Sequence, residues 1–213
     1  MRQVVPFDPE ARLLRDLVVF DLETTGLSAY DDEIIQIAAV RIRDGRIRAA
    51  ESFATYARPR RSISAFITRY TGITNADVRD APAPRQAVSA FSAFCGNGLL
   101  VAHNGHNFDI PFLQRVCARN GGLVREADYI DSMHLSWQVW GRTRGMSHGL
   151  DSVIARLGVR LRGARRHDAR GDVALLADCV VELLERMRRG GHRHHLNVYR
   201  CALPAVAPAR GSA

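Results

Sequence analysis

Lysine is absent from this chain, whose 30 basic residues are all arginine, and long hydrophobic runs are absent as well. A membrane-spanning helix needs about 20 consecutive apolar residues, and charged residues interrupt every apolar run well before that length. The first ten residues contain no apolar segment followed by a small-residue cleavage site, so the sequence gives no sign of a secretory signal. We therefore expect a cytoplasmic protein that does not associate with membranes.

Cysteine is scarce, and Cys95, Cys117, Cys179 and Cys201 include no Cys-x-x-Cys pair. This spacing indicates neither a zinc site nor a disulfide framework, so we expect the cysteines to be small core residues. Hydrophobic residues make up 46% of the chain, charged residues 24% and aromatic residues 7%, as in an ordinary globular protein. A length of 213 residues suits one α/β domain, with or without a tail.

The charge balance is basic, because 30 arginines outnumber 22 acidic residues and give a formal net charge of +8 and a pI near 10.1. Such a balance favours polyanionic partners, above all nucleic acid. One group of arginines, at positions 156, 160, 162, 165 and 166, fits either a track for a phosphate backbone or a solvated loop. The sequence leaves these two interpretations open.

Apolar patterning predicts strands that alternate with helices, which is typical of an α/β fold. A strand at 17–22 ends at a Thr-Thr-Gly turn, and strands at 34–43 and 47–56 flank Asp44-Gly45, a hairpin dipeptide. Further strands are expected at 99–102 and 129–130, and helices at 84–94, from about 109, at 147–157 and at 173–187. We interpret residues 1–15 as a leader, 16–189 as the folded domain and 190–213 as an irregular tail.

Two carboxylates, Asp21 and Glu23, stand at the end of the first expected strand. The two-residue period of a strand projects both side chains to the same face. Like charges this close disfavour each other's ionisation unless a cation lies between them, so the pair indicates a metal site or a shared proton. The alternative is a solvated strand end, and the surrounding motifs decide between the two.

Three segments carry the decisive pattern: Phe20-Asp-Leu-Glu-Thr-Thr-Gly-Leu27, Ala102-His-Asn-Gly-His-Asn-Phe-Asp-Ile-Pro-Phe-Leu113 and His167-Asp-Ala-Arg-Gly-Asp172. In this order they resemble the three motifs of the DnaQ-like 3′-to-5′ exonucleases, also called DEDDh exonucleases. That family includes the proofreading epsilon subunit of bacterial DNA polymerase III and the TREX-type enzymes. Residues 70–75 and 149–154 fit the same pattern, and the resemblance covers about residues 15–188.

The resemblance implies an RNase H-like fold, an α/β architecture with a central mixed five-stranded sheet flanked by helices. It also implies two divalent cations, Mg²⁺ or Mn²⁺, as cofactors. Hard oxygen ligands suit these ions, whereas a zinc site would favour histidine or cysteine. The carboxylates that would hold the two ions are Asp21, Glu23, Asp109 and Asp172.

In the third motif, the resemblance makes His167 the general base. His167 and Asp172 are five residues apart and cannot share one face of a continuous helix. We therefore expect Asp172 in the first turn of a helix that starts near residue 170, and His167 on the loop before it. Asp168 is a rival for Asp172, but the family spacing favours Asp172. The resemblance further implies that four residues contact the 3′-terminal nucleotide: Thr24, Thr25, Leu27 and Asn104.

These residues predict a metal-dependent 3′-to-5′ exonuclease that releases nucleoside monophosphates from DNA 3′ ends, in proofreading or repair. The expected partners are a single-stranded or frayed DNA 3′ end and, in proofreading, a DNA polymerase. Two alternatives stay open. One is an exoribonuclease of the same fold, because the motifs do not show how a 2′-hydroxyl is read. The other is a catalytically silent nucleic-acid-binding or polymerase-docking module, although all five catalytic positions are filled.

Overall fold

The computed structural model describes residues 2–120, 122–160, 169–190 and 194–205. Strands and helices alternate in these ranges, as expected for an α/β fold. The strands are β1 Arg2–Pro6, β2 Asp16–Thr24, β3 Ile34–Arg43, β4 Arg46–Tyr56, β5 Leu99–Ala102, β6 Val124–Asp131 and β7 His195–Pro204. The helices are the short 3-10 helix η1 Arg12–Leu14, α1 Ala65–Thr71, α2 Asn75–Val78, α3 Pro84–Cys95, α4 Asp109–Asn120, α5 Ser132–Trp140, α6 Leu150–Leu157 and α7 Ala169–Arg189.

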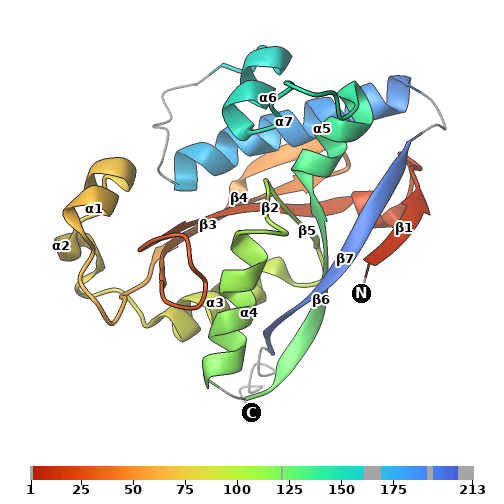
Figure 1. The fold of residues 1–213 in the computed structure, drawn as a ribbon. Helices are drawn as coiled ribbons and strands as arrows, with labels where there is room; N and C mark the ends of the chain where they lie inside the picture. The colour runs from red at the N-terminus through yellow and green to blue at the C-terminus, as the bar shows by residue number, and fades with distance from the viewer. Residues whose placement is uncertain (1, 121, 161–168, 191–193, 206–213) are drawn as a thin grey trace.

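The strands form one mixed sheet in the order β1-β7-β6-β5-β2-β3-β4 (Figure 1). β5 is parallel to both β2 and β6, and the other neighbouring pairs are antiparallel. β2, β3 and β4 make the expected three-stranded meander. Asp44 and Gly45 form the turn between β3 and β4 with φ values of 48° and 72°, which are left-handed values typical of a tight hairpin.

Helices cover both faces of the sheet, and β2 shows how the two faces are separated (Figure 1). Leu17 and Val19 pack in a buried cluster that also contains side chains of α5, α6 and α7. Val18, Phe20 and Leu22 pack in a second buried cluster with side chains of α3 and α4. Odd-numbered residues of β2 therefore face α7, and even-numbered residues face α3 and α4.

The two helices that carry expected ligands begin close to the expected positions. α4 begins at Asp109, which confirms the start inferred from the position of Pro111, and α7 begins at Ala169 with Asp172 in its first turn. The apolar pattern of the sequence did not reveal α1, α2 and α5. α1 and α2 have only seven and four residues, too few for a helical repeat of apolar positions to be recognised.

The sheet has seven strands instead of the five expected, because both end segments contribute one. β1 lies within the expected leader, and β7 lies within the expected irregular tail, a prediction that is wrong for residues 195–204. β7 pairs with both β1 and β6, and Leu196, Cys201 and Leu203 are buried. Histidines, arginines and prolines surround β7 in the sequence and favour an irregular segment. Its pairing partner β1 lies far away in the sequence, so no hairpin pattern indicated the strand. The remaining domain boundaries stay predictions.

The four cysteines all lie within the described residues and form no disulfide. Cys95, Cys179 and Cys201 are buried core residues, as expected, and Cys117 is half-buried. Burial raises the pKa of Cys95 and of Cys201 to about 12, so both remain thiols at neutral pH. Among the described helices, none has the length and apolar composition needed to cross a membrane.

Candidate functional site

Asp21 and Glu23 project from the end of β2 on the face that α7 covers. They continue the odd-numbered positions that Leu17 and Val19 begin, so acidic side chains replace the apolar ones toward the end of the strand. Glu23 is only 9% exposed, and Asp21 is half-buried. The alternation of the strand therefore brings both carboxylates to one side of the sheet.

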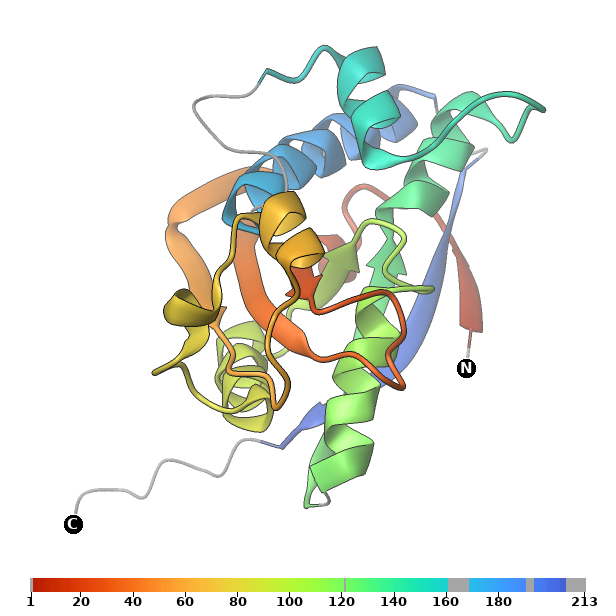
Figure 2. The ribbon, with the colours of Figure 1, turned by 60° about the vertical axis from the view of Figure 1, so that its left-hand side comes forward.

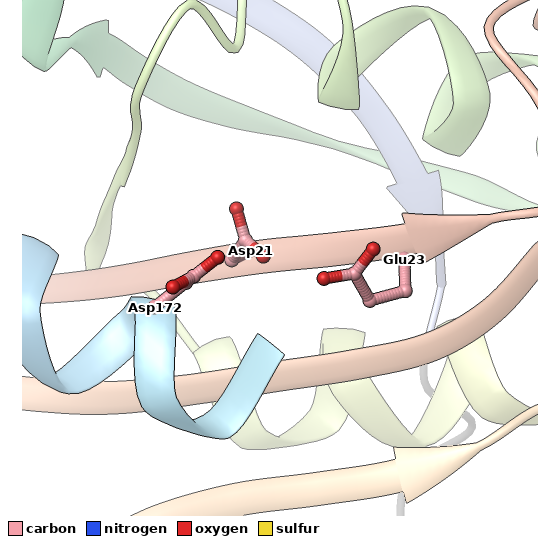
Figure 3. A group of neighbouring side chains, drawn as sticks. All are labelled: Asp21, Glu23 and Asp172. Atoms are coloured by element: carbon pink, nitrogen blue, oxygen red, sulfur yellow. The ribbon is translucent and has the colours of Figure 1, made fainter. Parts of the chain in front are cut away.

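Asp172 approaches this pair from the first turn of α7. Gln36, which lies opposite Glu23 on β3, anchors the start of that helix because its Oε1 accepts the N–H of Ala169 at 3.0 Å in a buried contact. The ligand oxygens of Asp21, Glu23 and Asp172 lie within 4.8 Å of one another (Figure 3). Three carboxylates from two elements thus converge, as the three-motif pattern implies.

Asp109 begins α4 and is almost completely buried. Its Oδ1 accepts the backbone N–H of Leu22, the residue between Asp21 and Glu23, at 3.2 Å. Burial, together with the nearby Asp131 carboxylate, raises the pKa of Asp109 to about 7, although the N–H of Leu22 acts in the opposite direction. Asp109 therefore lies against the same end of β2, although the group of carboxylates within 4.8 Å of one another does not include it.

His167 and Asp168 lie outside the described residues, so the assignment of His167 as the general base stays a prediction. The structure does place the other half of the third motif, because Asp172 joins the carboxylate cluster. Two members of the arginine group that precedes this motif, Arg156 and Arg160, are described. Arg156 lies over the ring of Trp140 at 4.8 Å and also donates to the carbonyl of Ser147, so its guanidinium packs against the protein.

The loop after β2 carries three of the expected substrate contacts. Thr24 Oγ1 donates to the carbonyl of residue 26 at 2.5 Å. Thr25 Oγ1 donates to Asp32 at 3.1 Å and accepts the N–H of Glu33 at 3.0 Å, which closes the base of the loop. Leu27 is 87% exposed. The threonine hydroxyls therefore hold the loop, and Leu27 offers an apolar surface; their contact with a nucleotide stays a prediction.

The loop that contains Asn104 is held by Asp131, which none of the sequence motifs includes. Asp131 accepts the N–H groups of Asn104, His106 and Met133 at 2.9, 3.1 and 2.9 Å, and it is 2% exposed. Asn104 has a φ of 57°, in the left-handed region, and its Oδ1 accepts the side chain of Asn107. Asp131 also caps α5, so an aspartate at a strand end before a helix was the available signal.

The donor set of the cluster consists of carboxylate oxygens alone. Among the described residues, neither histidine nor cysteine belongs to the group of ligand atoms that Asp21, Glu23 and Asp172 form. Oxygen ligands suit hard cations such as Mg²⁺ and Mn²⁺, whereas structural zinc sites use cysteine and histidine. The site therefore fits a hard divalent cation, which would also relieve the repulsion among the carboxylates.

The sequence model of the family described as Exonuclease (RNase_T) matches residues 18–180, which include all three motif regions. The chain belongs to this exonuclease family. It is 36% identical over 188 residues to a "DNA polymerase III PolC-type" protein of Caldanaerobacter subterraneus subsp. tengcongensis. It is 41% identical over 175 residues to a "DNA polymerase III subunit epsilon-like protein" of Rhodobacter capsulatus. These alignments cover 88% and 82% of the exonuclease-family chain but 13% and 24% of the relatives, so it spans a quarter or less of their length.

Solved structures of nucleases share the fold of this exonuclease-family protein. The structure of Exonuclease X in complex with 5′ overhanging duplex DNA matches with a TM-score of 0.62 and 24% identity, over 79% of this chain and 91% of that one. The nuclease domain of 3′hExo, a DEDDh family member bound to rAMP, matches with a TM-score of 0.68 and 19% identity, over 86% and 96%. These likenesses confirm the RNase H-like exonuclease fold, and at such identities they establish the fold alone.

Proposed function

We propose that this protein is a metal-dependent 3′-to-5′ exonuclease that hydrolyses phosphodiester bonds at DNA 3′ ends and releases nucleoside monophosphates. The observation that carries the proposal is the convergence of Asp21, Glu23 and Asp172 within 4.8 Å, on the elements where the motifs lie. Membership in the exonuclease family supports the same reaction. A silent binding module would have no need to keep three mutually repelling carboxylates together.

Two divalent cations, Mg²⁺ or Mn²⁺, would be held by Asp21, Glu23 and Asp172 together with Asp109. When bound, such ions supply Lewis-acid stabilisation of the attacking water and of the leaving 3′ oxygen. Asp109 is suited to join them because a cation beside it would favour its ionised form and offset the rise in pKa that burial causes.

His167 would accept the proton of the attacking water. An imidazole with an ordinary pKa near 6.5 can take a proton at neutral pH, and such a base contributes roughly 10² to 10⁴ in rate. Ala169, two residues later, is anchored to Gln36, so the chain enters the cluster region at a defined point just after the base.

The substrate would be a single-stranded or frayed DNA 3′ end. Leu27 would pack against the terminal base, Thr24 and Thr25 would hold the loop that carries it, and Asn104 would lie near the terminal sugar or phosphate. The net charge of +8 supports a polyanionic substrate. The names of the polymerase III relatives support a DNA polymerase as a partner. A role in proofreading or repair and a cytoplasmic location stay predictions.

The proposal is tested by digesting a 5′-labelled single-stranded DNA with Mg²⁺ or Mn²⁺ and, separately, with chelator. We expect stepwise shortening from the 3′ end, nucleoside monophosphate products and no reaction in chelator. A duplex with a mismatched 3′ end and an RNA of the same sequence are digested in parallel. Internal cuts would overturn the exonuclease proposal, and faster digestion of the RNA would establish an exoribonuclease instead. Binding without any hydrolysis would identify the silent module.

A pair of variants with the same change in charge tests the ligand assignment. Asp172→Ala removes one carboxylate of the cluster, so both the activity and the metal-induced rise in melting temperature should drop. Asp168→Ala, four residues earlier, should largely keep both. If Asp168→Ala abolishes the metal response and Asp172→Ala does not, the assignment of the third motif is wrong, and the role of His167 falls with it.

A further inference from the structure

A groove of about 760 Å³ lies outside the carboxylate cluster, and arginine dominates its walls. The walls come from the loop between β2 and β3, the segment after β4, the start of α3 and one side of α4. The loop between β2 and β3 passes across α4 in Figure 2. The charged residues that line this arginine groove are Arg58, Arg60, Arg85, Arg115, Arg119, Asp32 and Glu33.

The two carboxylates of the arginine groove are already used within its walls. Asp32 accepts the hydroxyl of Thr25 at 3.1 Å and the N–H of Ser28 at 3.0 Å, inside the loop between β2 and β3. Glu33 accepts both the N–H and the side chain of Arg60, at 2.7 and 2.9 Å. These contacts leave the groove with an excess of positive charge.

Three arginines on the other walls contact neutral groups. Arg58 donates to the carbonyl of Arg79 at 3.3 Å, Arg115 lies over the ring of Tyr30 at 4.4 Å, and Arg119 donates to the carbonyl of Tyr30. Within the part of the chain that the structure describes, none of Arg58, Arg115 and Arg119 forms an ion pair with a carboxylate. Their charges are therefore available to an anion from outside the protein.

The loop between β2 and β3 connects the candidate site with the arginine groove. Thr25 follows Glu23 by two residues, and its N–H donates to the carbonyl of Glu33 at 2.9 Å, while the N–H of Glu33 donates to the Thr25 hydroxyl at 3.0 Å. Glu33 in turn lines the groove. The loop that follows Glu23 therefore borders the arginine groove where it returns to β3.

We propose that the arginine groove binds the phosphate backbone of the nucleic acid whose 3′ end is at the carboxylate cluster. This inference rests on the proposed function for the identity of the polyanion. Repeated guanidinium groups on three separate segments match a repeated phosphate charge, whereas one small anion would need donors that converge on a point. The bound backbone belongs either to the strand being shortened or to a complementary strand, and both present the same phosphodiesters.

The test measures binding in chelator, so that it does not depend on cleavage. The probes are a labelled single-stranded oligonucleotide and a duplex with a short single-stranded 3′ end, each titrated at several salt concentrations. Arg58→Gln with Arg119→Gln removes two groove charges. Arg46→Gln with Arg48→Gln is the matched control, because both arginines are exposed on β4 at the opposite end of the strands from Glu23.

The groove variant is expected to show a weaker salt dependence of nucleic-acid affinity than the parent. Each lost phosphate contact lowers the slope of log affinity against log salt by about 0.7 for a single strand and about 0.9 for a duplex. The groove variant should therefore lose about 1.4 or 1.8 from the slope, and roughly tenfold in affinity near 0.15 M salt. The control should stay near the parent, and Arg58→Lys with Arg119→Lys should restore the slope because lysine keeps the charge.

The outcomes separate the two strands and the two proposals. A defect with the single strand assigns the groove to the strand being shortened, and a defect with the duplex alone assigns it to the complementary strand. Equal slopes for the parent, the groove variant and the control, with unchanged melting temperatures, would contradict the proposal that the arginine groove binds a phosphate backbone. Binding through these arginines without hydrolysis of DNA or RNA would contradict the proposed function but still support the binding role of the arginine groove.

Discussion

Gln36 shows how one neutral side chain organises a cluster of charges. It lies directly opposite Glu23 in the antiparallel pair of β2 and β3, and its Oε1 accepts the first N–H of α7. The first N–H groups of a helix have no partner within the helix, so a buried acceptor at that point also fixes where the helix begins. By fixing the start of α7, this contact helps to position Asp172, which lies three residues further along the helix.

Replacing Gln36 by methionine keeps the length of the side chain and removes the acceptor. The N–H of Ala169 would then be buried without a partner, so Gln36→Met should lose about 1–3 kcal/mol of unfolding free energy. It should also need several-fold more Mg²⁺ for half-maximal activity, because Asp172 is less well held. Gln114→Met, at an exposed position on α4, is the control and should change stability by about 0.5 kcal/mol or less. A parent-like metal titration for Gln36→Met would contradict the positioning role.

At the level of elements, two helices on opposite faces of the sheet bring their N-terminal turns to the same end of β2. Asp109 begins α4 and contacts Leu22, while Asp172 lies in the first turn of α7 and joins Asp21. The N-terminal turn of a helix carries partial positive charge, worth about 0.3–1 kcal/mol to a nearby carboxylate. The N-terminal turns of the two helices therefore stabilise the nearby carboxylates before any cation binds.

A histidine links α5 to the segment that enters α6. His148 is 8% exposed, and its Nδ1 lies 2.7 Å from the hydroxyl of Ser136 on α5. Burial lowers the pKa of His148 below its ordinary value near 6.5, and the charge of Arg156 lowers it further. The folded state therefore prefers the neutral imidazole, and protonation favours unfolding.

The stability that His148 contributes should be fully present above about pH 6.5 and should be lost as the pH falls below that value. His148→Asn keeps a short polar group toward Ser136 and cannot be protonated. Urea unfolding at pH 7.5 and pH 5.0 should show a smaller acid-induced loss in the variant than in the parent. His134, whose pKa is also lowered by burial, is present in both proteins and cancels in the comparison. Equal acid-induced losses would show that His148 is not the group responsible.

At the level of the whole molecule, the segment that follows α7 returns to complete the sheet. Leu203 on β7 is fully buried in the cluster that contains α3 and α4, and β7 lies between β1 and β6. The hydroxyl of Ser92 on α3 also donates to the carbonyl of Pro204 at 2.7 Å. Residues near the C-terminal end of the described chain therefore belong to the folded core.

Leu203→Ala measures this contribution. A large-to-small change in a close-packed core costs about 2–5 kcal/mol, so the urea midpoint should fall markedly. Val4→Ala on β1 is the control, because Val4 is 51% exposed and its truncation should cost much less. Equal, small effects of the two variants would show that β7 does not contribute to the core.

Short-range patterns were sufficient for the meander, for the start of α4 and for the shared face of Asp21 and Glu23. Each depends on neighbours within a few residues: alternation along a strand, a hairpin dipeptide, or a proline that fits only a first helical turn. The same kind of signal existed in part for β7, where Leu196 and Val198 alternate with polar residues. It was too short to outweigh the surrounding glycines, histidines and prolines.

Local backbone geometry was enough to indicate which residue types the site could use and which of them share a face. The folded structure was needed to show which distant groups meet: Gln36 with Ala169 across 133 residues, Asp131 with the loop of Asn104, and arginines 58, 85, 115 and 119 around one groove. Such contacts depend on how the sheet and helices pack. A contact between residues far apart in the chain leaves no periodic trace in the sequence around either of them.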